Sequence, residues 1–159
     1  MSKNQTAVSL DRIDRLMLSI LQREGRINNQ DLAERVSLSP SPCLRRLRRL
    51  EDAGVIRHYG AVLEPALVGM GLLAYVNVRV DKQAAPGHAD GTTLDKLFAR
   101  AVQDWPEVVE CHAMTGDLDY LLRVQVADLD HFSRFMMDSL MKQAGVLDVR
   151  SSLSLRAIK

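Results

Sequence analysis

The succession of apolar patterns in residues 72–157 limits the fold of this chain more than any other feature. Apolar side chains recur at every second position in 72–80 and 120–126, residues 149–157 alternate in the same way except at Ser151, and residues 108–115 are predicted to form a further strand. Two helices are predicted between these strands from apolar residues at helical spacing: Leu94, Leu97, Phe98, Ala101 and Val102, then Leu129, Phe132, Met136 and Leu140. The order is β-α-β-β-α-β, which is typical of a ferredoxin-like domain.

Such a domain has one uncovered sheet face. Four antiparallel strands with both helices on one side leave the other side open, and here that side carries apolar and small residues on several strands. An uncovered face of this kind indicates an assembly surface. We therefore expect two copies of the sheet to pair into a dimer.

The first third of the chain predicts three short helices. The first follows an N-cap at Asp11, with Asp14 three residues later, and we expect it to end at Gly25. Its apolar stripe consists of Ile13, Leu16, Met17, Ile20 and Leu21. The second begins near residue 28 or 29 and carries Leu32, Ala33 and Val36. The third is predicted to begin after Ser39 with Pro40 in its first turn and to run to about Ala53, where Gly54 closes it.

The third helix has two unlike faces. At about 100° per residue, one side gathers Cys43, Leu47, Leu50 and Gly54, and the other gathers Ser41, Arg45, Arg48, Arg49 and Asp52. The major groove of B-DNA admits one helix, and arginine binds guanine O6 and N7 or a phosphate. Taken alone, the cluster is equally consistent with a solvated basic face. Two preceding helices and a tight turn favour the recognition helix of a helix-turn-helix, with Arg46 on the flank contacting phosphate.

Residues 55–63 alternate partly and predict a short β extension, which would make the helix-turn-helix a winged one and place Arg57 near the DNA backbone. The expected fold class is thus α+β, with a helix-turn-helix domain at 1–63, a linker at 64–71 and a ferredoxin-like domain at 72–159. The residues expected to bind double-stranded DNA are Ser39, Ser41, Arg45, Arg46, Arg48, Arg49 and Arg57.

The distribution of charge along the chain agrees with a DNA-binding first part. Residues 1–63 hold 11 Lys and Arg against 7 Asp and Glu, a net charge of +4. Residues 64–159 hold 10 against 13, a net charge of −3, so the formal charge of +1 for the whole chain hides the asymmetry. This distribution fits one half that meets phosphate and one that does not.

Other classes of protein find less support. The two cysteines are far apart, and the four histidines are scattered, so we expect no disulfide framework, metal site or cofactor. The chain has no GxSxG, P-loop or Rossmann motif, and we expect no catalytic residue. Without an apolar run long enough for a signal peptide or a membrane span, we expect a cytoplasmic, nucleoid-associated protein with no membrane partner.

Two segments of the chain resemble the Lrp/AsnC family of transcription regulators. They are LDRIDRLMLSILQREGRINNQDLAERVSLSPSPCLRRLRRLEDAGVIRHYGAVLEP and WPEVVECHAMTGDLDYLLRVQVADLDHF. The resemblance implies a dimer that binds DNA and assembles into tetramers, octamers or larger species. It also implies an effector, an amino acid or related metabolite, which binds between C-terminal domains and changes assembly or DNA affinity.

The family's Gly-x-x-Asp-Tyr turn, which lies near that effector site, maps onto Gly116, Asp119 and Tyr120. The candidate effector-binding residues are therefore Thr115, Gly116, Asp117, Asp119 and Tyr120. A carboxylate here suits an ammonium, and backbone N–H groups around the glycine suit a carboxylate. A plain β-turn is the alternative. The loop at 82–93 is longer than the family pattern, which leaves the identity of the effector open.

Two other functions stay open at this point. Proteins similar to this family act as sirohaem decarboxylases, so the chain could be an enzyme on the same scaffold. It could also be an interaction module that assembles through its ferredoxin-like domain and has a degenerate helix-turn-helix. The arginine-rich third helix argues against both, because neither needs a DNA-reading face.

Overall fold

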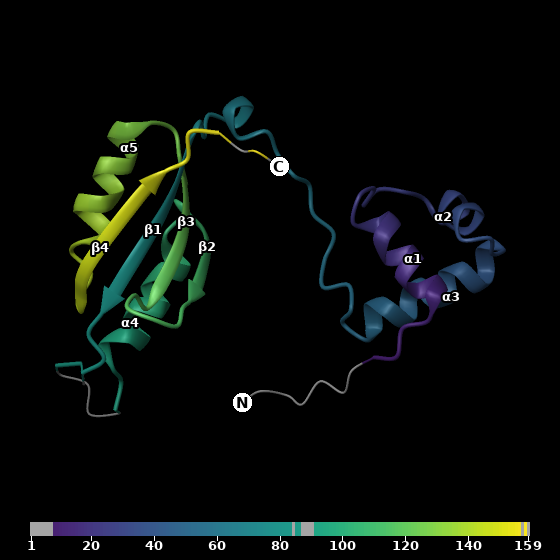
Figure 1. Ribbon diagram of the computed structural model, residues 1–159, viewed down its shortest axis with the longest axis horizontal. Coiled ribbons are helices and arrows are strands. Elements are labelled where there is room, and N and C mark those ends of the chain that lie inside the picture. Colours follow the sequence, from purple (N-terminus) through teal and green to yellow (C-terminus); the bar gives the residue numbers. More distant parts are fainter. Residues whose placement is uncertain (1–7, 84, 87–90, 157, 159) are drawn as a thin grey trace. The chain divides into compact units, whose positions relative to one another are not determined.

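The computed structural model describes residues 8–83, 85–86, 91–156 and 158. The chain divides into two compact units, Met1–Val62 and Leu63–Lys159, each shown in Figure 1. Within the described residues, no helix is long and apolar enough to cross a membrane.

The N-terminal unit contains the three predicted helices: α1 at Arg12–Leu21, α2 at Asn29–Arg35 and α3 at Pro40–Asp52. A capping box begins α1, in which the Asp11 carboxylate accepts the N–H of Asp14 at 2.8 Å and the Asp14 carboxylate accepts the N–H of Asp11 at 3.0 Å. The helix ends at Leu21, four residues before the predicted stop at Gly25.

The second and third helices begin in different ways. Asn28 caps α2 by accepting the N–H of Asp31. Ser39 occupies the predicted N-cap of α3 but makes no side-chain cap bond, and Pro40 at the first helical position supplies a preset φ instead. Gly54 follows the helix at a φ of 70°, which fits its predicted role as the stop. The core of this unit consists of Met17, Ile20, Leu32, Ala33, Val36 and Cys43.

The short strand predicted at 55–63 is absent, so this prediction is wrong. None of these residues is in a strand, and the N–H groups of Val55 and Ile56 both donate to the Leu50 carbonyl at the end of α3. A strand requires a ladder partner. The described part of this unit has none to offer.

The C-terminal unit is a four-stranded antiparallel sheet with helices. Its strands are β1 at Leu72–Val80, β2 at Val108–Ala113, β3 at Tyr120–Val126 and β4 at Val146–Leu153. Helix α4 spans Leu94–Ala101 and continues into the 3₁₀ turn η2 at Val102–Asp104, whereas α5 spans Leu129–Arg134 and continues into the π-helical segment η3 at Phe135–Leu140. A short 3₁₀ helix, η1 at Pro65–Val68, precedes β1. The strand order β2-β3-β1-β4 confirms the ferredoxin-like arrangement.

The last strand lies earlier in the chain than predicted. It was expected at 149–157 but spans Val146–Leu153, and its pairing with β1 shifts register between Arg79 and Val80. The final backbone bond of the sheet is donated by Ser154 to the Leu73 carbonyl at 2.8 Å. The predicted end at residue 157 lies outside the described residues.

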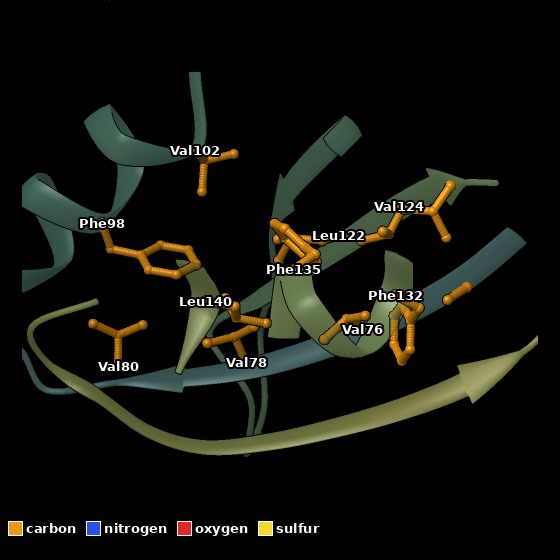
Figure 2. Close-up of a cluster of buried hydrophobic side chains, with 12 residues drawn as sticks. Val76, Val78, Val80, Phe98, Val102, Leu122, Val124, Phe132, Phe135 and Leu140 are labelled. Atoms are coloured by element: carbon orange, nitrogen blue, oxygen red, sulfur yellow. The ribbon is translucent and has the colours of Figure 1, made fainter. Parts of the chain in front are cut away.

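Both helices cover the same face of the sheet. Alternate residues of β1 and β3, such as Val76 and Leu122, are paired in register and fully buried. Figure 2 shows them in one cluster with the helical side chains Phe98, Phe132, Phe135 and Leu140. The Phe98 ring also lies 5.9 Å from that of Trp105 and 4.9 Å from that of Tyr120, centroid to centroid.

The opposite face of the sheet is mixed in character. Its positions on β1 and β3 include Leu73, Tyr75 and Leu121, and Tyr75 is 40% exposed. Polar and charged side chains lie among them, with Arg123 bound to Glu110 at 3.1 Å. This face is therefore less apolar than the face that packs against the helices, and it resembles an assembly surface with a polar rim.

Candidate nucleic-acid interface and effector turn

Helix α3 separates an apolar inner face from a charged outer one, as predicted. Cys43 and Leu50 are fully buried, whereas Ser41, Arg45, Arg48 and Arg49 are exposed. These exposed side chains border a broad surface hollow together with Leu44 and Asp52. A convex helix that carries exposed guanidinium groups can enter a groove and donate to base edges or phosphates.

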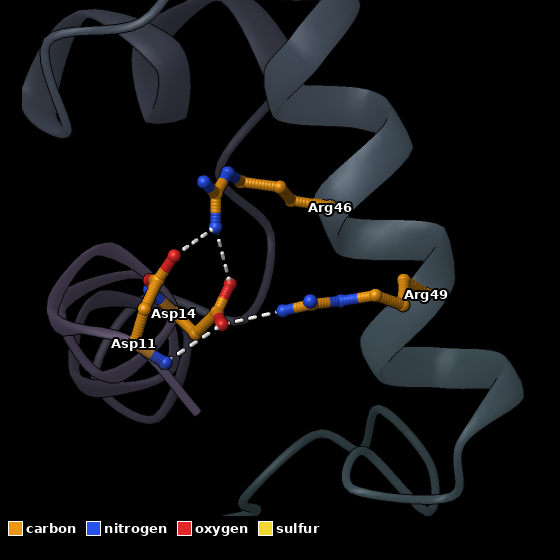
Figure 3. A network of polar contacts seen from close by, with 4 residues as sticks. All are labelled: Asp11, Asp14, Arg46 and Arg49. Carbon is orange, nitrogen blue, oxygen red and sulfur yellow. Dashed lines mark hydrogen bonds and ion pairs between the residues drawn. The ribbon is translucent and has the colours of Figure 1, made fainter. Parts of the chain in front are cut away.

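Two of the four arginines on α3 have carboxylate partners inside this unit. Figure 3 shows Arg46 Nη1 between Asp11 Oδ2 at 2.6 Å and Asp14 Oδ1 at 3.0 Å, while Arg49 Nη2 binds Asp14 Oδ2. The Asp14 side chain is only 1% exposed. The pKa of Arg46 is raised, mainly by its hydrogen bond to Asp11 and next by its hydrogen bond to Asp14. The pKa of Asp11 is lowered, mainly by the hydrogen bond from the N–H of Asp14 and next by the one from Arg46.

Sequence reasoning identified Asp14 as part of a helix cap and missed its contact with α3. A signal was present, because Asp14 shares a helical spacing with the buried Met17 and therefore places a carboxylate on the inner side of an apolar helix. A buried carboxylate requires a partner. The sequence could not say which arginine would provide it.

The remaining predicted DNA contacts are at the two ends of α3. Ser39 is exposed at the N-cap, beside the first turn of the helix, and Arg57 is exposed three residues after Gly54. The structure thus groups Ser39, Ser41, Arg45 and Arg48 on or beside the outer surface of α3. Arg57 lies on the following segment, next to His58 and Tyr59 in a second hollow.

The predicted effector turn joins β2 to β3 in the C-terminal unit. Gly116 has a φ of 112°, a region that glycine adopts without strain. Thr115, Gly116 and Asp117 are exposed, so this side of the turn is open to a ligand. Asp119 and Tyr120 are half-buried at the start of β3.

Asp119 is bound within the protein at four points, the first of which is its carbonyl, which accepts the N–H of Met114 at 2.8 Å. Its N–H donates to the Val78 carbonyl at 2.9 Å, and its Oδ2 accepts the N–H of Val80 at 2.9 Å. Its Oδ1 lies 2.6 Å from Lys82 Nζ. The hydrogen bond from Lys82, followed by that from Val80, lowers the pKa of Asp119. Asp119 therefore fixes the turn to strand β1, and Asp117 is the carboxylate that faces outward.

Tyr120 is fixed to helix α4. Its hydroxyl donates to the Asp95 carbonyl at 3.4 Å, its ring packs on Phe98, and burial raises its pKa. Two bonds also join the described ends of the long loop, from Ala85 N–H to the Thr92 carbonyl and from Leu94 N–H to the Gln83 carbonyl. Residues 84 and 87–90 of this loop lie outside the described residues.

A metal centre finds no geometric support in the part of the chain that the structure describes, where no three His, Cys, Asp or Glu side chains form a ligand set. Cys43 is buried and Cys111 is half-buried, and desolvation raises the pKa of both thiols. Neither cysteine therefore has the exposed thiolate character of a nucleophile.

Two family models match the chain, one to each unit. A model of winged helix-turn-helix DNA-binding domains matches residues 10–57, and a model of the Lrp/AsnC ligand binding domain matches residues 73–159. The chain belongs to the Lrp/AsnC family. It is accordingly a DNA-binding transcription regulator with an effector-binding C-terminal domain, and the regulator is favoured over the enzyme alternative.

Relatives of this Lrp/AsnC protein match it over almost its whole length. The leucine-responsive regulatory protein of Escherichia coli K12 is 39% identical over 158 residues, which cover 99% of this chain and 92% of that protein. A transcriptional regulator from Neisseria meningitidis, solved as a complex with L-Met, is 45% identical, with a TM-score of 0.87 over 95% of this chain and 93% of that one. An AsnC family regulator from Agrobacterium tumefaciens is 37% identical, with a TM-score of 0.81 over 94% and 93%.

Proposed function

We propose that this regulator reads a specific double-stranded DNA sequence with the exposed outer face of α3, using Arg45 and Arg48 for the direct contacts. One observation carries this assignment. Arg45, Arg48 and Arg49 are all exposed on α3, but Arg49 and the half-buried Arg46 bind the carboxylates of Asp14 and Asp11. Among the described residues, Arg45 and Arg48 have no carboxylate partner. An arginine with no competing carboxylate has its planar donor fork available for guanine or phosphate.

Ser39, Ser41 and Arg57 complete the proposed interface. Ser39 and Ser41 lie at the N-terminal end of α3, which is the part of a recognition helix that meets base edges and where helix N–H groups favour a phosphate. Arg57 is exposed after the helix and suits a contact to the DNA backbone. Phosphate contacts set the register of the protein on the duplex, and base contacts carry the sequence information.

The assignment is tested with two substitutions, Arg45→Ala and Arg48→Ala, on a duplex selected from a randomised library and on a scrambled duplex. A lost bidentate base contact costs about 1–3 kcal/mol, or about 5- to 150-fold in affinity, and relaxes the preference at one position. The control Arg100→Ala removes the same charge from an exposed site on α4. Equal losses on both duplexes, or the same loss for the control, would contradict the assignment.

For the effector we propose an amino acid bound at the exposed side of the turn formed by Thr115, Gly116 and Asp117. The Asp117 carboxylate would meet the ammonium, and backbone N–H groups around Gly116 would meet the carboxylate. Asp119 and Tyr120 would hold the turn in place through Val80 and Asp95. L-methionine is the first ligand to test, because a relative that is 45% identical was solved with it.

Calorimetric titration of the full chain with each amino acid tests this site. Asp117→Asn should weaken binding of the effector at least about tenfold, because a hydrogen bond to a charged group contributes about 1.5–3 kcal/mol. Asp130→Asn on α5 is the matched control, since it removes another exposed carboxylate outside the turn. Unchanged binding by Asp117→Asn would move the site elsewhere.

We further propose that two copies pair through the uncovered sheet face and that dimers assemble into tetramers, octamers or larger species. The mixed face containing Tyr75 and Arg123 supports this, and a two-fold dimer matches a two-fold DNA site. Sedimentation of the full chain measures the assembly directly, and a monomer at micromolar concentration would contradict it. Binding to DNA places the protein at the nucleoid, in the cytoplasm.

A further inference from the structure

Asp14 lies on α1, where its charged side chain is fully buried and contacts two arginines of the DNA-binding helix α3. We propose that it is a positioning residue for DNA recognition: it binds the guanidinium groups of Arg46 and Arg49, so that those of Arg45 and Arg48 are the ones on α3 left to contact the duplex. The proposal rests on the DNA interface described above and adds a residue that does not itself touch DNA. It makes sequence selectivity depend on a carboxylate behind the recognition helix.

The contacts of Asp14 account for its effect on the arginines. Its Oδ1 accepts from Arg46 at 3.0 Å, and its Oδ2 accepts from Arg49 and from the N–H of Asp11. With 1% of the side chain exposed, water cannot replace these donors. A buried carboxylate that loses its donors carries a large desolvation cost. Both guanidinium groups are therefore kept at Asp14 rather than free to sample other positions.

The turn of the helix separates the two pairs of arginines. Arg45 and Arg48 are centred on the outer side of α3, and Arg46 and Arg49 are centred about 100° around the axis, although Arg49 itself lies only about 40° from Arg45 and borders the same outer hollow. Arg46 and Arg49 remain partly accessible to solvent, because the Arg46 side chain is 30% exposed and the Arg49 side chain is 50% exposed. Once released, these long side chains can extend to the phosphates that flank a groove.

Releasing them would change the kind of binding as well as its strength. A phosphate contact is available on any duplex, so each new one raises affinity for specific and random DNA alike. The ratio of the two affinities then falls, because the base contacts of Arg45 and Arg48 become a smaller part of the total. Asp14 thus limits sequence-independent binding.

The test is the salt dependence of DNA binding by the full chain carrying Asp14→Asn, measured on a selected duplex and a scrambled one. Each released arginine that reaches a phosphate makes the slope of log K against log salt more negative by about 0.9 per protomer. We expect a slope steeper by about 0.9–1.8 per protomer and a lower ratio of specific to random affinity. An unchanged slope and an unchanged ratio in a folded Asp14→Asn protein would overturn the proposal.

Two further variants separate release of the arginines from other effects. Adding Arg49→Gln to Asp14→Asn should reverse about half of the extra slope, which a purely structural defect would not do. Glu34→Gln, exposed on α2, raises the net charge equally without freeing either arginine, and its slope should match that of the parent protein. A slope as steep as that of Asp14→Asn for this control would overturn the proposal.

Arg49→Gln keeps the test decisive if Asp14→Asn does not fold. Arg49 is held at Asp14, so its removal should take no phosphate contact away, and Asp14 keeps Arg46 and the N–H of Asp11 as donors. We expect the salt slope of Arg49→Gln to match that of the parent protein. A slope shallower by about 0.9 per protomer would mean that Arg49 already contacts a phosphate, and would overturn the proposal. A parent protein with no salt-dependent DNA binding would instead reject the proposed function itself.

Discussion

Gly145 lies where the π-helical end of α5 turns into strand β4, and replacing it with alanine should destabilise the C-terminal unit by about 2–6 kcal/mol. Its φ of 89° would strain an L-residue by about 1–3 kcal/mol. An added Cβ would lie 2.7 Å from Leu94 Cβ, well inside the usual 3.5–4.0 Å separation of carbon atoms. Relieving that overlap requires α4 to shift, which adds about 1–3 kcal/mol.

Urea unfolding followed by tryptophan fluorescence measures this loss. The sole tryptophan, Trp105, packs edge-on against Phe98 and Phe135 in the core of the C-terminal unit, so its emission reports on that unit. With an m-value of about 2 kcal/mol/M, the midpoint should fall by about 1–3 M while m stays constant.

Gly69→Ala is the matched control for this prediction. Gly69 ends η1 with a φ of 75°, and a Cβ there meets nothing within 4 Å, so only backbone strain of about 1–2 kcal/mol applies. The close approach to Leu94 predicts a clearly larger loss for Gly145→Ala. Equal losses of unfolding free energy for the two variants, or a loss under about 1 kcal/mol for Gly145→Ala, would contradict the predicted overlap with Leu94.

Two further predictions use the same fluorescence signal. Phe98→Ala should lower the free energy of unfolding by about 3–5 kcal/mol, because this ring is fully buried between Trp105 and Tyr120, and a loss below 1 kcal/mol would show that the cluster is not a rigid core. Asp119 has a folded-state pKa below its ordinary value of 3.8, owing chiefly to Lys82, so its stabilisation is present above that value and is lost as the pH falls through the lower folded pKa. Asp119→Asn should therefore flatten the acid side of the stability curve, and an acid limb with unchanged steepness would contradict the role assigned to the ion pair.

Local patterns in the sequence predicted most of the secondary structure. The capping box at Asp11 and the period-two alternation in 72–80 and 120–126 are properties of neighbouring residues, and the structure confirms both. Together with the helical spacing in 94–102 and 129–140, these patterns predicted the β-α-β-β-α-β order, and the strand order of the sheet confirms the ferredoxin-like arrangement expected from it.

The features that could not be predicted from the sequence depend on contacts between residues far apart in the chain. A strand at 55–63 fitted the local alternation, but strand formation requires a partner that this unit lacks among its described residues. The bounds of β4 depend on a register shift at Arg79 and Val80. The division of the four arginines on α3 depends on Asp14, which is more than 30 positions away in the chain. Helical periodicity could place the arginines on faces but could not assign their partners.

We propose that the exposed face of α3 reads DNA sequence and that an amino acid controls its affinity. This is tested by selecting duplexes from a randomised library with the full chain, in the presence and in the absence of a pool of amino acids. We expect enrichment of one two-fold symmetric motif, which Arg45→Ala loses and whose affinity one amino acid shifts. Equal recovery of all duplexes, with no change when amino acids are added, would contradict it.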